Sequence, residues 1–440
     1  MNTRPSLTQV WKHILSIILV LLLLSACGNT AAPTTNTSAD SETDAQSSEP
    51  VTLTIWATGD EDEGKLLFSA AERFMAENPN VTIELQPISW DDAHAKILSA
   101  ATSRTGPDII TGGLSWGIEF GQLGGMIDLR ENYPDIVAEI EESVHQGIYQ
   151  SVVSPENEVY GVPWDLTIYQ MFYRPDLLEE ITGSGEPPAT WGELTTTISQ
   201  IQDSGKKGFA MQWGNTQWLQ YFNFLTQAGG ALYDDTCSAV TINSPEAVEA
   251  LTFYTDLYST YNAPTDGWPD LEGGMVSGDY PIGYTGSWIA GSLDASYPEL
   301  EGKWTLAPLA AGPTGEPTAF MGGRVIGIMS YSEVPDTAAE FIRSIYNDET
   351  ADAMTATAAE LNLFYIPPRA DFADKIQAPE ERVESIKAQL ANSKGPPNCT
   401  GWEESSQVVE QKLQQVIFEG ADPQTALDEA AVVMTQNLTQ

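Results

Sequence analysis

Basic side chains are scarce in this chain of 440 residues. Lysine and arginine together number 19, against 62 aspartates and glutamates, so the formal net charge is −43 at pH 7. A surface of this charge repels nucleic acid and anionic lipid headgroups. The imbalance therefore excludes a nucleic-acid partner, although it says nothing about the fold.

Histidine and cysteine are equally rare, with three of each. Their positions show none of the Cys/His spacing that is typical of zinc sites. The acidic stretch "DEDEG" lacks the calcium-loop positions beyond its first two acids. We therefore expect no metal site and no other cofactor.

The shortage of histidine also bears on an esterase motif. "GLSWG", Gly113 to Gly117, fits the G-x-S-x-G nucleophile elbow, which needs an acid and then a histidine further along the chain. His94 precedes the motif, and His145 follows it too closely to leave room for the missing strand–helix units. The sequence therefore predicts a protein that is not an enzyme.

The chain also lacks a hydrophobic run long enough to span a membrane, which takes about 20 residues. The run from Ile14 to Leu24 is apolar except for Ser16, but it is too short. Arg4 and Lys12 precede this run and small residues follow it. This order is typical of an export signal, here over residues 1–26. A membrane anchor or a buried helix is the alternative.

The signal ends at "LSAC", which resembles the lipobox of bacterial lipoproteins. The resemblance implies cleavage before Cys27 and a diacylglycerol on its sulfur. Residues 28–50 have no basic or aromatic side chain, so residues 27–50 are expected to form the lipidated cysteine and a flexible tether. We expect an extracytoplasmic protein, at the cell surface or the periplasmic face, that contacts the cell membrane only through this lipid.

Two cysteines remain, Cys237 and Cys399. An even pair in an exported protein favours a disulfide, which would stabilise the fold by about 4–5 kcal/mol in the chain-entropy model. Two buried thiols are the alternative.

The body opens with alternating strand and helix patterns. Strands are expected at 51–58, 81–88 and 107–110, because apolar residues alternate or run together there. Helical spacing fills 64–77 and 91–103 between them. This βαβαβ order predicts a parallel sheet with helices on both faces, and ligands on such sheets bind beyond the carboxyl ends of the strands.

Further helices begin at recognisable caps. Thr190 with Glu193, Ser244 before Pro245, and Asp422 before Pro423 are typical helix starts, and Gly420 is a typical helix end. Helices and short strands interleave throughout, so the fold class is α/β. The length of residues 51–440 indicates two domains.

Several phrases in order resemble the extracellular solute-binding proteins of bacterial sugar ABC transporters, near the binders of maltose, trehalose and similar oligosaccharides. These phrases are "TGPDIITGGLSWGIEFGQLGGMIDL", "YGVPWDLTIYQMFYRPDLL", "PPATWGEL", "GYTGSW", "MGGRVIGI" and "FYIPPR". The resemblance implies a two-lobed periplasmic-binding-protein fold, each lobe a mainly parallel sheet flanked by helices, with a ligand cleft and a hinge between the lobes. It places lobe 1 at 51–163 plus 322–366 and lobe 2 at 164–321 plus 367–440, with Cys237 and Cys399 both in lobe 2.

The implied function is capture of a carbohydrate, a di- or oligosaccharide, by hinge closure and its delivery to the membrane permease of an ABC importer. The protein is expected to act as a monomer. Aromatic rings would cover the apolar faces of the sugar, and polar groups would bind its hydroxyls. The residues expected to bind the ligand are Asp60, Glu61, Ser115, Trp116, Asp165, Trp213, Asn215, Trp288, Gly323, Arg369 and Trp402.

Each of these residues has an alternative role. Any tryptophan can belong to the core, Asp60 and Glu61 can complement a helix N-terminus, and Arg369 can form a salt bridge. Two other functions stay open. The acidity permits a cationic ligand such as a polyamine, caged by aromatic rings, and paired carboxylates permit a cell-surface glycoside hydrolase.

Overall fold

The computed structural model describes residues 49–211, 213, 216–265 and 271–439. The predicted signal and Cys27 lie outside the described residues. The strands are β1 (Val51–Thr58), β2 (Val81–Ile88), β3 (Ile109–Gly113), β4 (Val162–Tyr173), β5 (Phe209–Met211), β6 (Ile282–Gly286), β7 (Thr305–Ala307), β8 (Ala319–Ile328) and β9 (Ser393–Lys394). The α-helices are α1 (Glu61–Glu77), α2 (Trp90–Ser103), α3 (Trp116–Gln122), α4 (Leu129–Asn132), α5 (Pro134–Ser143), α6 (Gln146–Tyr149), α7 (Pro175–Thr182), α8 (Trp191–Asp203), α9 (Gln217–Gln227), α10 (Pro245–Ser259), α11 (Leu271–Ser277), α12 (Ile289–Ser296), α13 (Pro335–Ser344), α14 (Asp348–Glu360), α15 (Glu380–Leu390), α16 (Trp402–Glu419) and α17 (Pro423–Leu438). Short 3-10 helices cover Gln150–Val152, Pro298–Leu300 and Ala370–Lys375.

The first five elements form the βαβαβ unit that the alternation predicts. β1 pairs in parallel with β2 along its whole length, from Val51 opposite Val81 to Thr58 opposite Ile88. β1 also pairs in parallel with β3. The three strands therefore end at one edge of the sheet, where a parallel α/β sheet places its ligand loops.

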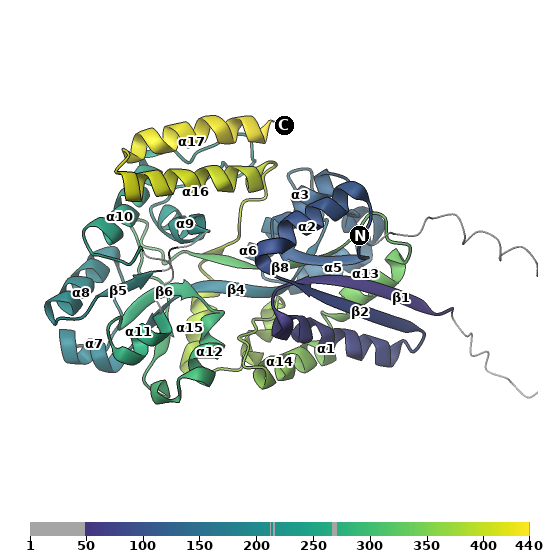
Figure 1. The fold of residues 1–440 in the computed structure, drawn as a ribbon, viewed down its shortest axis with the longest axis horizontal. Coiled ribbons are helices and arrows are strands. Elements are labelled where there is room, and N and C mark those ends of the chain that lie inside the picture. Colours follow the sequence, from purple (N-terminus) through teal and green to yellow (C-terminus); the bar gives the residue numbers. More distant parts are fainter. Residues whose placement is uncertain (1–48, 212, 214–215, 266–270, 440) are drawn as a thin grey trace, which may run out of the picture. The chain divides into compact units, whose positions relative to one another are not determined.

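The sheet is mixed beyond this unit. Its strands follow the order β2-β1-β3-β8-β4-β6-β5, and β7 and β9 pair with β4 and β8. β8 runs antiparallel to β3 and to β4, and β4 runs antiparallel to β6, whereas β5 and β6 are parallel. The predicted parallel pairing is therefore found at the two outer ends of the sheet, between β2, β1 and β3 and between β6 and β5. The two long strands β4 and β8 lie in the middle of the ribbon in Figure 1 and connect both halves of the sheet.

Apolar side chains gather in clusters, and the largest extends across both halves of the sheet. It packs α1 and α13 against β1 and β2, with Leu53, Leu67 and Phe341 fully buried, and continues through β4 to α12 and α15. A second unites α8, α9 and α10 with the C-terminal pair α16 and α17. Figure 1 shows this pair, in yellow, lying side by side over α9 and α10.

The cap residues expected from the sequence stand where the helices begin and end. The hydroxyls of Thr190 and Ser244 accept backbone N–H bonds at the starts of α8 and α10, and Asp422 does so at the start of α17. Gly420 ends α16 with a φ of +72°, a conformation that glycine adopts without strain.

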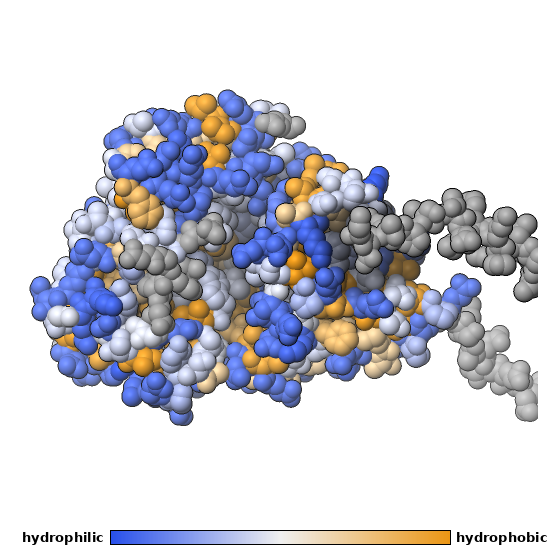
Figure 2. All heavy atoms as spheres, in the orientation of Figure 1, coloured by the Kyte–Doolittle hydropathy of each residue, from blue (hydrophilic) through white to orange (hydrophobic). Residues whose placement is uncertain are grey.

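Hydrophilic residues predominate on the face shown in Figure 2, and hydrophobic ones form separate patches among them. Among the described residues, no helix combines the length and the apolar character that a membrane crossing requires. The residue bounds of the two lobes stay a prediction.

Candidate functional site

A tryptophan stands just past the carboxyl end of β3. The ring of Trp116 folds back over Gly112 and Gly113, and a Cβ placed on Gly112 would meet it at 2.3 Å. The ring also lies edge-on to Trp90 and His94, with centroids 5.7 Å and 5.0 Å away. The two glycines therefore make room for an indole at the edge where ligands of such sheets bind.

The same arrangement recurs at the end of β6. Trp288 lies over Gly286, and a Cβ on this glycine would meet the ring at 1.7 Å. The ring packs edge-on against Tyr169 at 5.5 Å, yet 40% of Trp288 remains exposed. An exposed indole held by its neighbours is a preformed flat surface that can accept a ligand face.

A pocket of about 300 Å³ lies between α3 and the start of α16. Of the residues expected to bind the ligand, Ser115 and Trp402 line it, whereas Trp288 and Asp165 do not. Its lining residues are Ser115, Ile118, Glu119, Gln122, Leu123, Pro397, Asn398, Cys399, Thr400, Gly401, Trp402, Glu403, Glu404 and Asn437.

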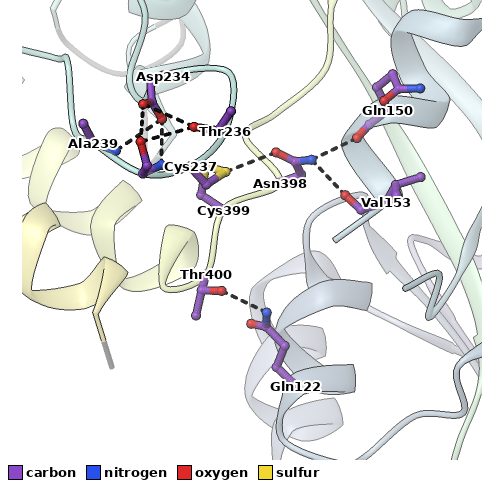
Figure 3. The surroundings of a disulfide bond; sticks show 11 residues. Gln122, Gln150, Val153, Asp234, Thr236, Cys237, Ala239, Asn398, Cys399 and Thr400 are labelled. Atoms are coloured by element: carbon purple, nitrogen blue, oxygen red, sulfur yellow. Dashed lines mark hydrogen bonds between the residues drawn. A yellow bond between two sulfur atoms is a disulfide. The ribbon is translucent and has the colours of Figure 1, made fainter. Parts of the chain in front are cut away.

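The pocket wall is held by the disulfide that the cysteine count favours. Cys237 and Cys399 are bonded, with Cα atoms 5.3 Å apart. Asn398 donates to the backbone oxygen of Val153 at 2.8 Å, and Gln122 donates to Thr400 at 2.9 Å (Figure 3). The disulfide therefore anchors a segment that also bonds to α3 and to the loop before β4.

Trp402 begins α16 and is 3% exposed. Its ring packs edge-on against Trp218 at 4.8 Å and Tyr233 at 6.2 Å. Its indole N–H is shielded from solvent and lacks an acceptor within the described part of the chain. The residue thus serves the core and also offers a free donor at the pocket wall.

Three ionisable groups meet beside this pocket. His94 Nε2 lies 2.7 Å from Glu119 Oε2, and this hydrogen bond raises the pKa of His94. Burial raises the pKa of the Glu403 carboxyl to about 7, while Ser115 and His94 oppose the shift. The sequence did not predict this group, because its three residues belong to α2, α3 and α16, which are far apart in the chain.

A buried ion pair joins the two long strands. Asp165 on β4 accepts from the Arg324 backbone N–H at 2.7 Å and from its Nε at 2.8 Å. Arg324 also lies 3.0 Å from Glu63 of α1 and donates to the carbonyl of Thr58 at 3.0 Å. Its guanidinium stacks over Trp164, 4.4 Å from the ring centroid. The Asp165 carboxylate, expected to bind ligand hydroxyls, thus holds the central strands together.

Three other expected residues also make local contacts. Asp60 caps α1 by accepting from the N–H groups of Asp62 and Glu63, both at 2.9 Å, and Glu61 is exposed in the first helical turn. Gly323 has a φ of +143°, and a Cβ there would meet the Asp165 carbonyl oxygen at 2.2 Å. Glycine at this position therefore allows β8 to approach β4.

Two further expected residues, Trp213 and Arg369, do not line the pocket. Trp213 is buried and packs edge-on against Tyr258 at 5.4 Å and Phe418 at 4.7 Å. Asn215 lies outside the described residues. Arg369 forms ion pairs with Asp348 at 2.7 Å and Asp371 at 2.6 Å, the salt-bridge role named as its alternative.

Residues 58–352 match the family of bacterial extracellular solute-binding proteins. The chain belongs to that family. As a member it is the substrate-binding protein of an ABC transporter and not an enzyme, and the esterase and hydrolase alternatives fall away.

Two curated relatives and a solved structure resemble this solute-binding protein. A probable ABC transporter-binding protein of Deinococcus radiodurans is 28% identical over 232 residues, which are 50% of this chain and 53% of the relative, so the match spans about half of that protein. The lactose-binding protein of Rhizobium radiobacter is 25% identical over 304 residues, 67% of this chain and 70% of the relative. A crystal structure of the GacH receptor of Streptomyces glaucescens, from a series with and without acarbose, superposes with a TM-score of 0.77 at 22% identity, covering 89% of this chain and all of that one.

This solute-binding protein shares the α/β periplasmic-binding-protein fold with the GacH structure.

Three residues of the central ion pair and the pocket were not expected from the sequence, namely Arg324, Glu119 and Glu403. An arginine inside the apolar strand "RVIGI" was the available signal for Arg324, because a buried charge requires a partner. No comparable signal marks Glu119 or Glu403 among so many acids.

Proposed function

We propose that this solute-binding protein captures a carbohydrate, a di- or oligosaccharide, and delivers it to the permease of its ABC transporter. The observation that carries the proposal is the exposed indole of Trp288 at the carboxyl end of β6. Burying a large aromatic face releases water favourably, and the C–H face of a sugar ring is a matching apolar surface. A free protein leaves such a ring exposed at a cost that a stacking ligand removes.

Trp116 supports the same proposal from the other half of the sheet. Trp116 is the first residue of α3 and Trp288 immediately precedes α12, both just after a strand, and both rings lie over glycines of that strand. A ligand held by Trp116, Trp288 and the pocket-lining Ser115 would contact elements on both sides of β4 and β8. The lactose-binding relative is named for a disaccharide, which agrees with a ligand of this size.

The full set of ligand-binding residues stays part of this proposal, as do the lobe bounds, hinge closure and the monomeric state. Asp165, Arg369 and Asp60 have internal partners in this conformation, and we assign them to the ligand only in so far as binding rearranges those contacts. The tether and the acylated Cys27 would keep the binding body close to the permease.

The proposal is tested first by a thermal-shift panel of neutral di- and oligosaccharides against diamines. A sugar at a hundredfold excess over its dissociation constant stabilises the protein by about 2.7 kcal/mol. Stabilisation by diamines alone would favour the cationic ligand and overturn the carbohydrate proposal.

Variants of Trp288 then test the site. Trp288→Ala removes the flat surface and is expected to weaken binding of the sugar found in the panel at least tenfold, whereas Trp288→Phe keeps a ring and should lose less. Isothermal titration measures both, and circular dichroism confirms that both variants fold. Equal affinity in the wild type and both variants would remove Trp288 from the site.

A further inference from the structure

We propose that His94, Glu119 and Glu403 form a binding site for a divalent transition-metal ion of the zinc class. One ligand atom from each residue lies within 4.8 Å of the others. None of the three side chains is among the residues assigned to the carbohydrate, but Glu119 and Glu403 line the same pocket as Ser115 and Trp402.

The donor set selects the class of metal. One imidazole nitrogen and two carboxylates suit Zn²⁺ and neighbouring first-row ions, whereas Mg²⁺ and Ca²⁺ prefer oxygen ligands alone. Three protein ligands and a solvent molecule complete a tetrahedral zinc site, and the pocket beside Glu119 and Glu403 has room for the solvent.

The Glu403 carboxylate supplies an observation of its own. Its Oε1 atom is shielded from solvent and accepts no hydrogen bond from the described residues. A buried carboxylate oxygen without a partner is costly, and a metal ion is one of the few groups that compensate it. Glu403 and Glu119 both line the pocket, and one carboxylate oxygen of Glu403 belongs to the cluster.

A small rearrangement completes the site. His94 Nε2 and Glu119 Oε2 lie 2.7 Å apart as a hydrogen-bonded pair. Two ligands of a tetrahedral zinc ion lie roughly 3.3 Å apart when each bond is about 2.0–2.1 Å long. The ion therefore replaces the shared proton and moves these two atoms roughly 0.6 Å further apart. The ligand atom of Glu403 lies within 4.8 Å of both, so a side-chain movement of at most about 1.5 Å brings it to the same spacing.

The location gives the metal a conformational effect. His94 and Glu119 belong to α2 and α3, whereas Glu403 belongs to α16 near the far end of the chain. An ion bound by all three favours the arrangement in which α16 faces α2 and α3, because an arrangement that separates them loses a ligand.

The test titrates Zn²⁺ into the metal-free chain with its disulfide intact. The chain carries Cys27→Ser so that this thiol cannot bind metal itself. Calorimetry is expected to give one site per chain, absent with Mg²⁺ or Ca²⁺, and Co²⁺ is expected to give the visible absorption of a tetrahedral site. His94→Gln, Glu119→Gln and Glu403→Gln should each weaken Zn²⁺ binding at least tenfold.

Glu404→Gln is the matched control, because Glu404 is the exposed neighbour of Glu403 with the same charge. It should leave the affinity within about twofold. Equal weakening by Glu404→Gln would mean diffuse attraction to an acidic surface and would overturn the site. Binding unchanged in those of the three ligand variants that fold, or no saturable binding of Zn²⁺, would also overturn it.

Discussion

Asp165→Asn tests whether the ion pair between β4 and β8 holds the centre of the molecule together. The side chains of Asp165 and Arg324 are 7% and 6% exposed, so water screens their attraction little. Both Nε and Nη2 of Arg324 donate to one oxygen of the carboxylate. An asparagine can place its oxygen there or at the position that receives the Arg324 backbone N–H, but it cannot occupy both.

Removing one partner of a buried ion pair costs about 3–5 kcal/mol. Glu63 still lies 3.0 Å from Arg324 in the variant, so part of the positive charge stays compensated. We therefore expect a loss near the lower end, about 3 kcal/mol. Arg324→Met should cost more, because it leaves both Asp165 and Glu63 buried without their cation.

Guanidinium unfolding followed by circular dichroism measures these differences. The matched control is Asp279→Asn, which breaks an exposed pair with Lys207 whose side chains are 47% and 61% exposed. Exposed pairs contribute little, so the control should change stability by less than about 0.5 kcal/mol. If Asp165→Asn costs no more than the control, the pair does not stabilise the fold. If stability holds while sugar affinity falls, Asp165 acts on the ligand instead.

Two further predictions concern stability. Burial raises the pKa of Glu410 from 4.5 to about 7. The contribution of the protonated Glu410 carboxyl to the free energy of unfolding is therefore fully present below pH 4.5 and is lost as the pH rises through 7. Glu410→Gln keeps an acceptor for the backbone N–H of Trp218. Its free energy of unfolding should match that of the wild type at pH 4 and exceed it by roughly 2–3 kcal/mol at pH 8. A difference independent of pH would contradict the shifted pKa. Replacing Cys237 and Cys399 by serine opens a loop with a sequence separation of 162 and should lower stability by about 4–5 kcal/mol in denaturant titrations. A loss below about 1 kcal/mol would show that the disulfide constrains the unfolded chain far less than the loop length implies.

Local patterns were sufficient for much of the fold. The alternation in residues 51–58 and 81–88 gave two strands with the same bounds as β1 and β2. Thr190 and Ser244 marked helix starts correctly, because capping depends on a few adjacent residues. Counting cysteines favoured the Cys237–Cys399 pair for a similarly simple reason, since residues 51–440 contain only these two.

Such local patterns did not predict which group each charged side chain would contact. For Asp60 the sequence left open a ligand contact or a helix N-terminus, and the side chain caps α1. For Arg369 it left open a ligand contact or a salt bridge, and the side chain pairs with Asp348 and Asp371. In both cases a nearby group competes for the same side chain. Which competitor lies within reach depends on how the chain folds around it.

The sequence by itself determined the class of fold and the main helices and strands, because hydrophobic periodicity and helix caps act over a few residues, and its ordered phrases pointed to the family by resemblance. Only the tertiary structure decided that Asp165 meets Arg324, 159 residues away, and that Glu403 meets Glu119 and His94. Ion pairs and ligand clusters depend on distances of a few ångströms between elements that are far apart in the chain. Those distances are set by the packing of the whole sheet and its helices.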